Sequence, residues 1–158
     1  MVERWRHRRY DDRASMEGIG AEVVRAELLR LSARGLSLLV KKGERELFSS
    51  REEGLRPLLD AIRHIGKDLE GARVIDKVVG RAAAKLLAYA GVGGVIAAVA
   101  SRSAVEVLQT ACIPLGAQDV VDLIRGRSGA PCPFEVLAKE IEDPAAFLQE
   151  LVARLKSG

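Results

Sequence analysis

A run of nine small and apolar residues, Val92 to Ala100, constrains the fold of this chain more than any other feature. Apolar and polar residues do not alternate in it, so both faces are expected to be buried, as in a central strand covered by helices on either side. The run is too short to cross a bilayer as a helix, which needs about 20 residues. It therefore predicts an α/β domain and no membrane span.

Strands and helices are predicted before this run. Two segments of strand character flank Gly43-Glu44, which indicates a hairpin. Apolar residues at helical spacing mark the other segments, and Asp76 is placed as the N-cap of the helix that precedes the central strand. The predicted elements are a helix over Ala21–Ala33, strands over Leu36–Lys42 and Glu46–Ser49, and helices over Leu55–Ile65 and Asp76–Ala90.

Further helices and one strand are predicted at two capping patterns and after the central run. Ser50 with Glu53, and Ser103 with Glu106, fit capping boxes and indicate that helices begin there. The remaining predictions are a strand over Ile113–Gln118, a short helix over 120–124, a helix over Pro133–Ile141 and a last helix that begins at Asp143-Pro144. A hairpin followed by strand–helix crossovers implies a three-layer α/β/α domain with a mixed sheet of about four strands.

Length and charge limit the domain organisation and the partners. The 158 residues suit one domain, placed at residues 20–158 after a basic, flexible tail at residues 1–19. The tail carries much of the net charge of +3, so it either contacts nucleic acid or an anionic membrane surface or is a solvated terminus. Two cysteines and no apolar leader predict a soluble cytoplasmic protein without a disulfide framework. The oligomeric state stays open.

Several segments together resemble an uncharacterised prokaryotic family. They are the hairpin, Gly71-Ala72, the Asp-Lys-Val-Val-Gly segment at 76–80 with the alanines after it, the apolar strand, and Cys-Pro-Phe-Glu at 132–135. The family is the domain of unknown function numbered 1893, which is placed among the cytidine-deaminase-like folds. The resemblance spans about residues 20–142. It implies that fold but no established activity.

The deaminase-like fold implies a zinc site that this sequence does not supply. Zinc deaminases hold the metal with His or Cys at the start of one helix and with Pro-Cys-x-x-Cys at the start of the next, while a Glu moves protons. The corresponding segments here, Asp76-Lys77-Val78 and Ser101-Arg102-Ser103, contain no such ligands, and Cys132 is not followed by a second Cys. The sequence therefore predicts neither a metal nor another cofactor.

A ligand site is predicted at these two helix starts, because the N-terminus of a helix attracts anions. The candidate ligand-binding residues there are Asp76, Lys77, Gly80, Ser101 and Ser103. Arg81 is a further candidate, because Lys77, Arg81 and Lys85 recur at every fourth position and are expected to form a basic ridge. A capping aspartate and solvated lysines are the alternative interpretation.

Cys132 is the candidate catalytic residue. It precedes a helix that begins at Pro133, where exposed amides lower the pKa of a thiol and raise its thiolate fraction. No histidine lies near it in sequence to act as a general base, and a buried, inert cysteine is the alternative. Glu135 is a candidate for ligand binding, or it caps its own helix from the third position.

These residues leave three hypotheses about function. The favoured one is a zinc-free relative of the deaminases that binds a small anionic or nucleotide-like ligand at the helix starts. The second is an enzyme or redox protein that uses Cys132. The third is a module that binds nucleic acid or another protein through the basic tail and the basic ridge. A fold by itself does not decide among them.

Overall fold

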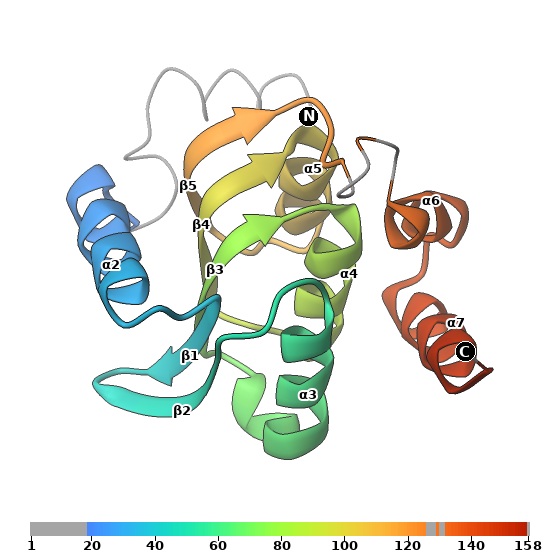
Figure 1. Cartoon of the computed structure of the whole chain (residues 1–158), viewed down its shortest axis with the longest axis horizontal. Coiled ribbons are helices and arrows are strands. Elements are labelled where there is room, and N and C mark those ends of the chain that lie inside the picture. Colours follow the sequence, from blue (N-terminus) through green and yellow to red (C-terminus); the bar gives the residue numbers. More distant parts are fainter. Residues whose placement is uncertain (1–18, 126–128, 130–131, 158) are drawn as a thin grey trace.

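The computed structural model describes residues 19–125, 129 and 132–157, which form three layers (Figure 1). The middle layer is a five-stranded sheet in the order β2-β1-β3-β4-β5. β1 runs antiparallel to both neighbours, and β3, β4 and β5 are parallel, so the sheet is mixed as predicted but has five strands instead of about four. The strands are β1 (Leu38–Lys42), β2 (Arg45–Ser50), β3 (Arg73–Val79), β4 (Gly94–Ser101) and β5 (Leu115–Val121).

Helices cover both faces of this sheet. α2 lies on one face, and α3, α4 and α5 lie on the other, with α6 and α7 packed against α4 (Figure 1). None of the described helices is long and apolar enough to cross a membrane. The helices are α2 (Ala21–Ala33), α3 (Arg56–Ile65), the 3-10 helix η2 (Gly66–Leu69), α4 (Arg81–Ala90), α5 (Arg102–Thr110), α6 (Pro133–Glu140) and α7 (Pro144–Ser157).

The central strands are buried on both faces, which confirms the prediction made from the apolar run. Leu39, Ile75 and Ile96 form a buried row under α2. Alternate residues of the same strands pack against α3, α4 and α5 on the opposite face. The strand formed by the apolar run, β4, begins at Gly94 and not at Val92. Gly93 lies so near the preceding loop that an added Cβ would come within 2.6 Å of the Gly71 carbonyl oxygen.

The predicted helix over Asp76–Ala90 is wrong in its first part. Residues up to Val79 form β3, and α4 begins at Arg81, after Gly80. β3 contains four β-branched residues, which favour a pleated strand: Val74, Ile75, Val78 and Val79. Gly80 separates this strand from α4. Asp76 is therefore a residue of a strand rather than the N-cap of a helix.

Three other predictions also need correction. Val120 and Val121 end the edge strand β5 and form no short helix. The prediction failed because a partly buried edge strand shows only weak alternation of apolar and polar residues. Ser50 ends β2, and α3 begins later, at Arg56. Ser101, and not Ser103, caps α5. The bounds of α2, the hairpin and the starts of α6 and α7 agree with the predictions.

The predicted tail, residues 1–19, lies outside the described residues except for its last residue. Ile19 is buried, and it packs in the cluster under α2. Between Arg125 and Cys132, only Gly129 is described.

Candidate functional site

A cavity of about 350 Å³, here called the carboxyl-edge cavity, lies where β3 ends. The loop before α3, the end of β3 and the starts of α4 and α6 form its walls. The apolar lining residues are Leu55, Pro57, Leu58, Val78, Ala82, Ala83, Ile124 and Phe134. The remaining ones are Ser37, Glu52, Glu53, Gly54, Asp76, Lys77, Gly80, Cys132 and Glu135.

The cavity brings together most, but not all, of the residues predicted for the site. Asp76, Lys77, Gly80, Cys132 and Glu135 line it. The other three candidates, Arg81, Ser101 and Ser103, are not among its lining residues. The shared location is thus the end of β3 together with the start of α6, and the start of α5 takes no part in it.

The start of α4 is occupied by a carboxylate of the protein itself. Glu135 accepts hydrogen bonds from the backbone N–H groups of Arg81, at 2.7 Å, and Ala82, at 2.6 Å. Gly80 makes room for this contact, because a Cβ at that position would overlap the Glu135 carboxylate. An incoming anion therefore finds these amides taken, and Glu135 caps α4 rather than its own helix.

Lys85 forms the matching contact at the other end of α6. It is 5% exposed, and its ammonium group donates hydrogen bonds to the carbonyl oxygens of Ile141 and Glu142. Burial lowers the pKa of this lysine, and the nearby charge of Arg81 lowers it further. The predicted basic ridge does not form, because Lys85 is buried and Lys77 lies on β3.

The start of α5 has a local cap. The Ser101 hydroxyl accepts a hydrogen bond from the Ala104 N–H at 3.1 Å, and it lies 3.0 Å from the Ser103 hydroxyl. Arg102 pairs with Asp122 at the surface. Ser101 therefore pairs with a free amide of the helix start and with the hydroxyl of Ser103, which gives the two serines a structural role.

Asp76 is the titratable group of the carboxyl-edge cavity whose pKa is shifted. The residue is half-buried, and burial raises its pKa to about 7, while hydrogen bonds from the backbone at Val78 and Lys77 oppose the rise. Within the described ranges, no cation forms an ion pair with this carboxyl. The charge of Asp76 therefore changes close to neutral pH.

Cys132 lies at the N-cap position of α6 and is half-buried. Its carbonyl oxygen accepts hydrogen bonds from the N–H groups of Glu135 and Val136, which are the first backbone bonds of the helix, and its side chain makes no capping hydrogen bond. Among the described residues no histidine lines the cavity, since His64 stacks on Phe48 elsewhere. Asp76, whose pKa is raised to about 7, lines the same cavity as the thiol.

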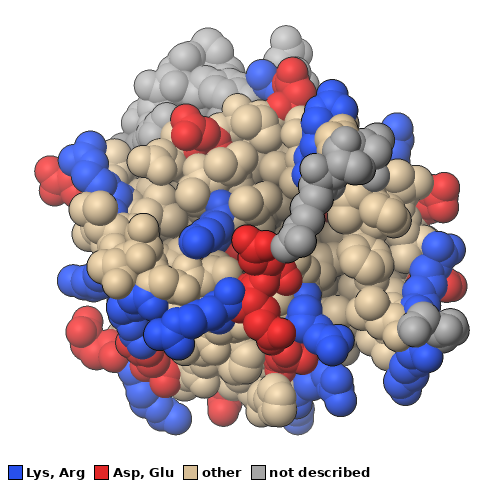
Figure 2. Space-filling view, in the orientation of Figure 1, with Lys and Arg blue, Asp and Glu red and all other residues tan. Residues whose placement is uncertain are grey.

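Acidic groups outnumber basic ones around the cavity. Among the described residues, its lining includes the acidic Glu52, Glu53, Asp76 and Glu135 and one basic residue, Lys77. On the face seen in Figure 2, a group of acidic side chains lies near the middle, next to basic ones. Among the residues that the structure describes, no three His, Cys, Asp or Glu side chains gather closely enough to hold a metal ion.

Several lining residues had no signal of function in the sequence. Leu55 and Leu58 belong to the apolar stripe at the start of α3, which predicts core packing and not a cavity wall, and Pro57 indicates only the first turn of that helix. Phe134 was visible within the Cys-Pro-Phe-Glu segment, since an aromatic residue at a helix start beside a candidate cysteine is a recognisable pattern.

The comparisons with known proteins identify relatives by sequence and by structure. Residues 27–154 match the family model described as a domain of unknown function (DUF1893). The chain also resembles the crystal structure, at 2.70 Å resolution, of a DUF1893 family protein (TM1506) from Thermotoga maritima. The two share 29% identity with a TM-score of 0.76, over 85% of this chain and 91% of that one. No curated protein matches the sequence. Since the family model spans most of its length, the chain belongs to the DUF1893 family.

Proposed function

We propose that this protein is a zinc-independent relative of the cytidine-deaminase-like folds and that its carboxyl-edge cavity binds a small nucleobase-like molecule. The observation that carries the proposal is the position of Asp76, a half-buried carboxyl on the wall of a largely apolar cavity. A buried polar group without a charged partner costs free energy, so a ligand that hydrogen-bonds to it gains affinity.

The arrangement of two helix starts supports the relation to deaminases. α4 and α5 follow the adjacent parallel strands β3 and β4, and they pack against each other. Zinc deaminases carry their metal ligands at two such starts. Here the starts contain Gly80-Arg81-Ala82 and Ser101-Arg102-Ser103, which offer no thiol or imidazole. The proposed relative therefore keeps the start of α4 as one wall of its cavity, while the start of α5 lies outside the cavity and neither start supplies a metal ligand.

The chemistry of the lining favours a neutral heterocycle over an anion. Four carboxyl groups against one lysine repel a negatively charged ligand, and Glu135 already holds the amides at the start of α4. A carboxyl such as Asp76 accepts hydrogen bonds when ionised and donates one when protonated, which suits the mixed edge of a nucleobase. Phe134 supplies an aromatic face for the ring.

Calorimetric titration with nucleobases and nucleosides at pH 6 to 8 tests this proposal. Binding by the wild-type chain is expected, with an affinity at least about tenfold weaker in Asp76→Asn, where one acceptor becomes a donor. Asp119→Asn is the matched control, because Asp119 is an exposed carboxyl on the edge strand β5. The absence of saturable binding across the panel, or equal losses in the two variants, would contradict the proposal.

A second candidate function rests on the shared location of Cys132 and Asp76 in one cavity. A carboxyl that titrates near pH 7 can accept a proton from a thiol, which is the arrangement that a cysteine nucleophile needs. Alkylation of Cys132 by iodoacetamide would then follow the ionisation of Asp76 and slow in Asp76→Asn. A rate equal to that of the exposed Cys112, unchanged in this variant, rules the thiol chemistry out.

A further inference from the structure

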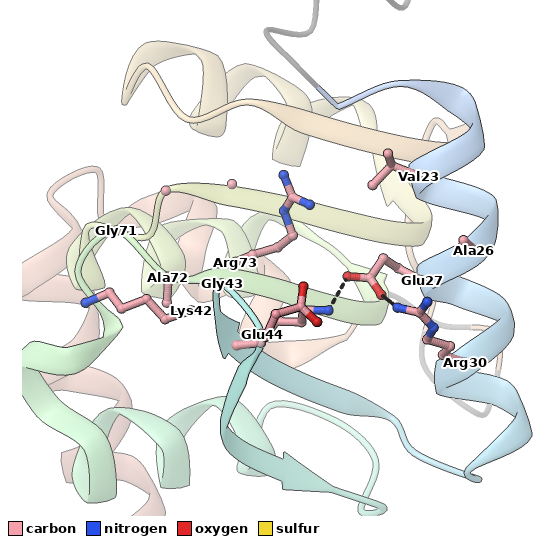
Figure 3. Close-up of a pocket in the computed structure, with 13 residues that line it drawn as sticks. Val23, Ala26, Glu27, Arg30, Lys42, Gly43, Glu44, Gly71, Ala72 and Arg73 are labelled. Carbon is pink, nitrogen blue, oxygen red and sulfur yellow. Dashed lines mark hydrogen bonds and ion pairs between the residues drawn. The ribbon is translucent and has the colours of Figure 1, made fainter.

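A second cavity, here called the amino-edge cavity, opens at the opposite edge of the sheet. It has a volume of about 570 Å³ and lies between α2, the turn of the hairpin and the amino ends of β3 and β4 (Figure 3). It shares no lining residue with the carboxyl-edge cavity. A ligand bound here is therefore independent of the nucleobase-like ligand proposed above.

The strand register explains why this cavity exists and why it is basic. Lys41, Arg73 and Gly94 are paired across β1, β3 and β4 and form one row. This row lies two residues beyond the buried apolar row under α2, so it presents side chains to the same face. Gly94 contributes no side chain to the row, and a Cβ at that position would lie 3.4 Å from the side chain of Ile19.

Two cations stand directly opposite each other in this row. Like charges at paired positions of neighbouring strands destabilise a sheet. Lys41 is partly neutralised, because its ammonium lies 3.0 Å from a carboxylate oxygen of Glu27, a residue that is 5% exposed. Glu27 also pairs with Arg30 at 3.2 Å. The buried glutamate thus holds one amino group and one guanidinium at the rim of the cavity, as the dashed lines in Figure 3 show.

Arg73 is the cation that has no such partner. No hydrogen bond or ion pair joins its guanidinium to any other group in the part of the chain that the structure describes. In Figure 3 its side chain extends from β3 into the cavity. A guanidinium has five donors in a planar fork, so Arg73 offers unused donors matched to a phosphate or carboxylate.

The charges around the cavity do not balance without a ligand. Of the residues that the structure describes, four basic and two acidic ones line it, and their net charge is 4 − 2 = +2. The basic ones are Arg30, Lys41, Lys42 and Arg73, and the acidic ones are Glu27 and Glu44. We propose that the amino-edge cavity binds a small phosphate-bearing anion, which Arg73 and Lys41 hold between them. Glu27 acts as a positioning residue for Lys41.

Inorganic phosphate and pyrophosphate at low ionic strength are the probes for this site. Calorimetric titration is expected to show saturable binding with one site per chain, and Arg73→Gln is expected to weaken it at least about tenfold. Because Arg73 has no structural partner among the described residues, this substitution is expected to leave the unfolding midpoint unchanged. Arg25→Gln is the matched control, since Arg25 is an exposed arginine of α2 outside the cavity.

The outcomes separate this proposal from the nucleobase-like ligand and from nucleic acid. Asp76→Asn should bind pyrophosphate as the wild type does, since it lies in the other cavity. Absence of saturation at millimolar pyrophosphate would overturn the proposal, and so would equal affinities of Arg73→Gln and Arg25→Gln. A single-stranded oligonucleotide that binds more tightly than pyrophosphate, and that depends on both arginines, would assign the surface to nucleic acid instead.

Discussion

The two helices that follow the central parallel strands have different starts, although each begins within two residues of the end of its strand. α5 is capped by its own Ser101, whereas α4 receives the carboxylate of Glu135, 54 residues from Arg81 in sequence. A local cap needs one side chain. The remote cap needs the packing of α6 and the absence of a side chain at Gly80 as well, so the start of α4 is tied to the carboxyl-edge cavity and the start of α5 is not.

Removing the remote cap is expected to have the largest effect. Glu135→Ala deletes two charge-assisted hydrogen bonds to backbone amides, and we expect it to lower the free energy of unfolding by about 2–4 kcal/mol. Urea unfolding measures the change. Glu140→Ala on the exposed side of α6 is the control. A loss no greater than that of the control would show that the contact contributes nothing.

Asp76 lies on the strand that precedes α4, and its ionisation is expected to make the stability of the protein depend on pH. Asp76 keeps its proton to about pH 7 in the folded chain, against 3.8 when unperturbed, so the folded state binds more protons in this window. Stability is therefore expected to fall as pH rises through it, by up to about 1.4 kcal/mol per unit.

Unfolding measured from pH 4 to pH 8 in Asp76→Asn should lack this dependence, because an amide does not titrate. The same measurement in Ser101→Ala should retain it, since that serine belongs to the other helix start. A slope of equal size in the wild type and Asp76→Asn would assign the pH dependence to another group.

A side chain at Gly80 tests the coupling behind the remote cap. Gly80 has extended backbone that any residue can adopt, so Gly80→Ala acts by pushing the Glu135 carboxylate off the amides, and we expect a loss of about 1–2 kcal/mol. In the Glu135→Ala background the same substitution should cost less than about 0.5 kcal/mol. Additive losses in this double-mutant cycle would disprove the coupling.

The smallest effect is expected at the local cap. Ser101→Ala removes one neutral capping hydrogen bond, which typically costs about 1 kcal/mol. Ser101→Asp should restore most of the stability, because an aspartate also caps. Ser103→Ala should lie within about 0.5 kcal/mol of wild type. If Ser101→Ala costs as much as Glu135→Ala, the contrast between the two starts disappears.

Much of the fold could be predicted because its signals are local. The apolar run that became β4, the hairpin at Gly43-Glu44 and the proline that begins α6 each depend on neighbouring residues. The failure at β3 has a physical cause. Val78 and Val79 lie at positions that continue the helical period of α4 backwards, so the strand before Gly80 resembled one more helical turn.

The sequence predicted where most of the candidate site lies, but it did not predict the contacts that its residues make. Asp76, Lys77 and Cys132 share a cavity because a strand end and a helix start meet, an arrangement that topology supplies. The contact between Glu135 and the start of α4 could not be predicted, because it joins residues more than 50 positions apart and no local sequence pattern indicates it. Lys85 did carry a signal, since a lysine inside the apolar stripe of a helix must find carbonyl or carboxylate partners.

The pair of contacts between α4 and α6 also bears on how a ligand reaches the carboxyl-edge cavity. Glu135 and Lys85 fasten α6 near its beginning and beyond its end, so the helix can neither swing nor slide without breaking a bond to backbone. We therefore expect this wall to move less than the opposite one. The opposite wall, formed by residues 52–55, is a connection outside any helix or strand. We expect admission and release of the ligand to occur there, past two glutamates that would delay anions and leave uncharged molecules free to pass.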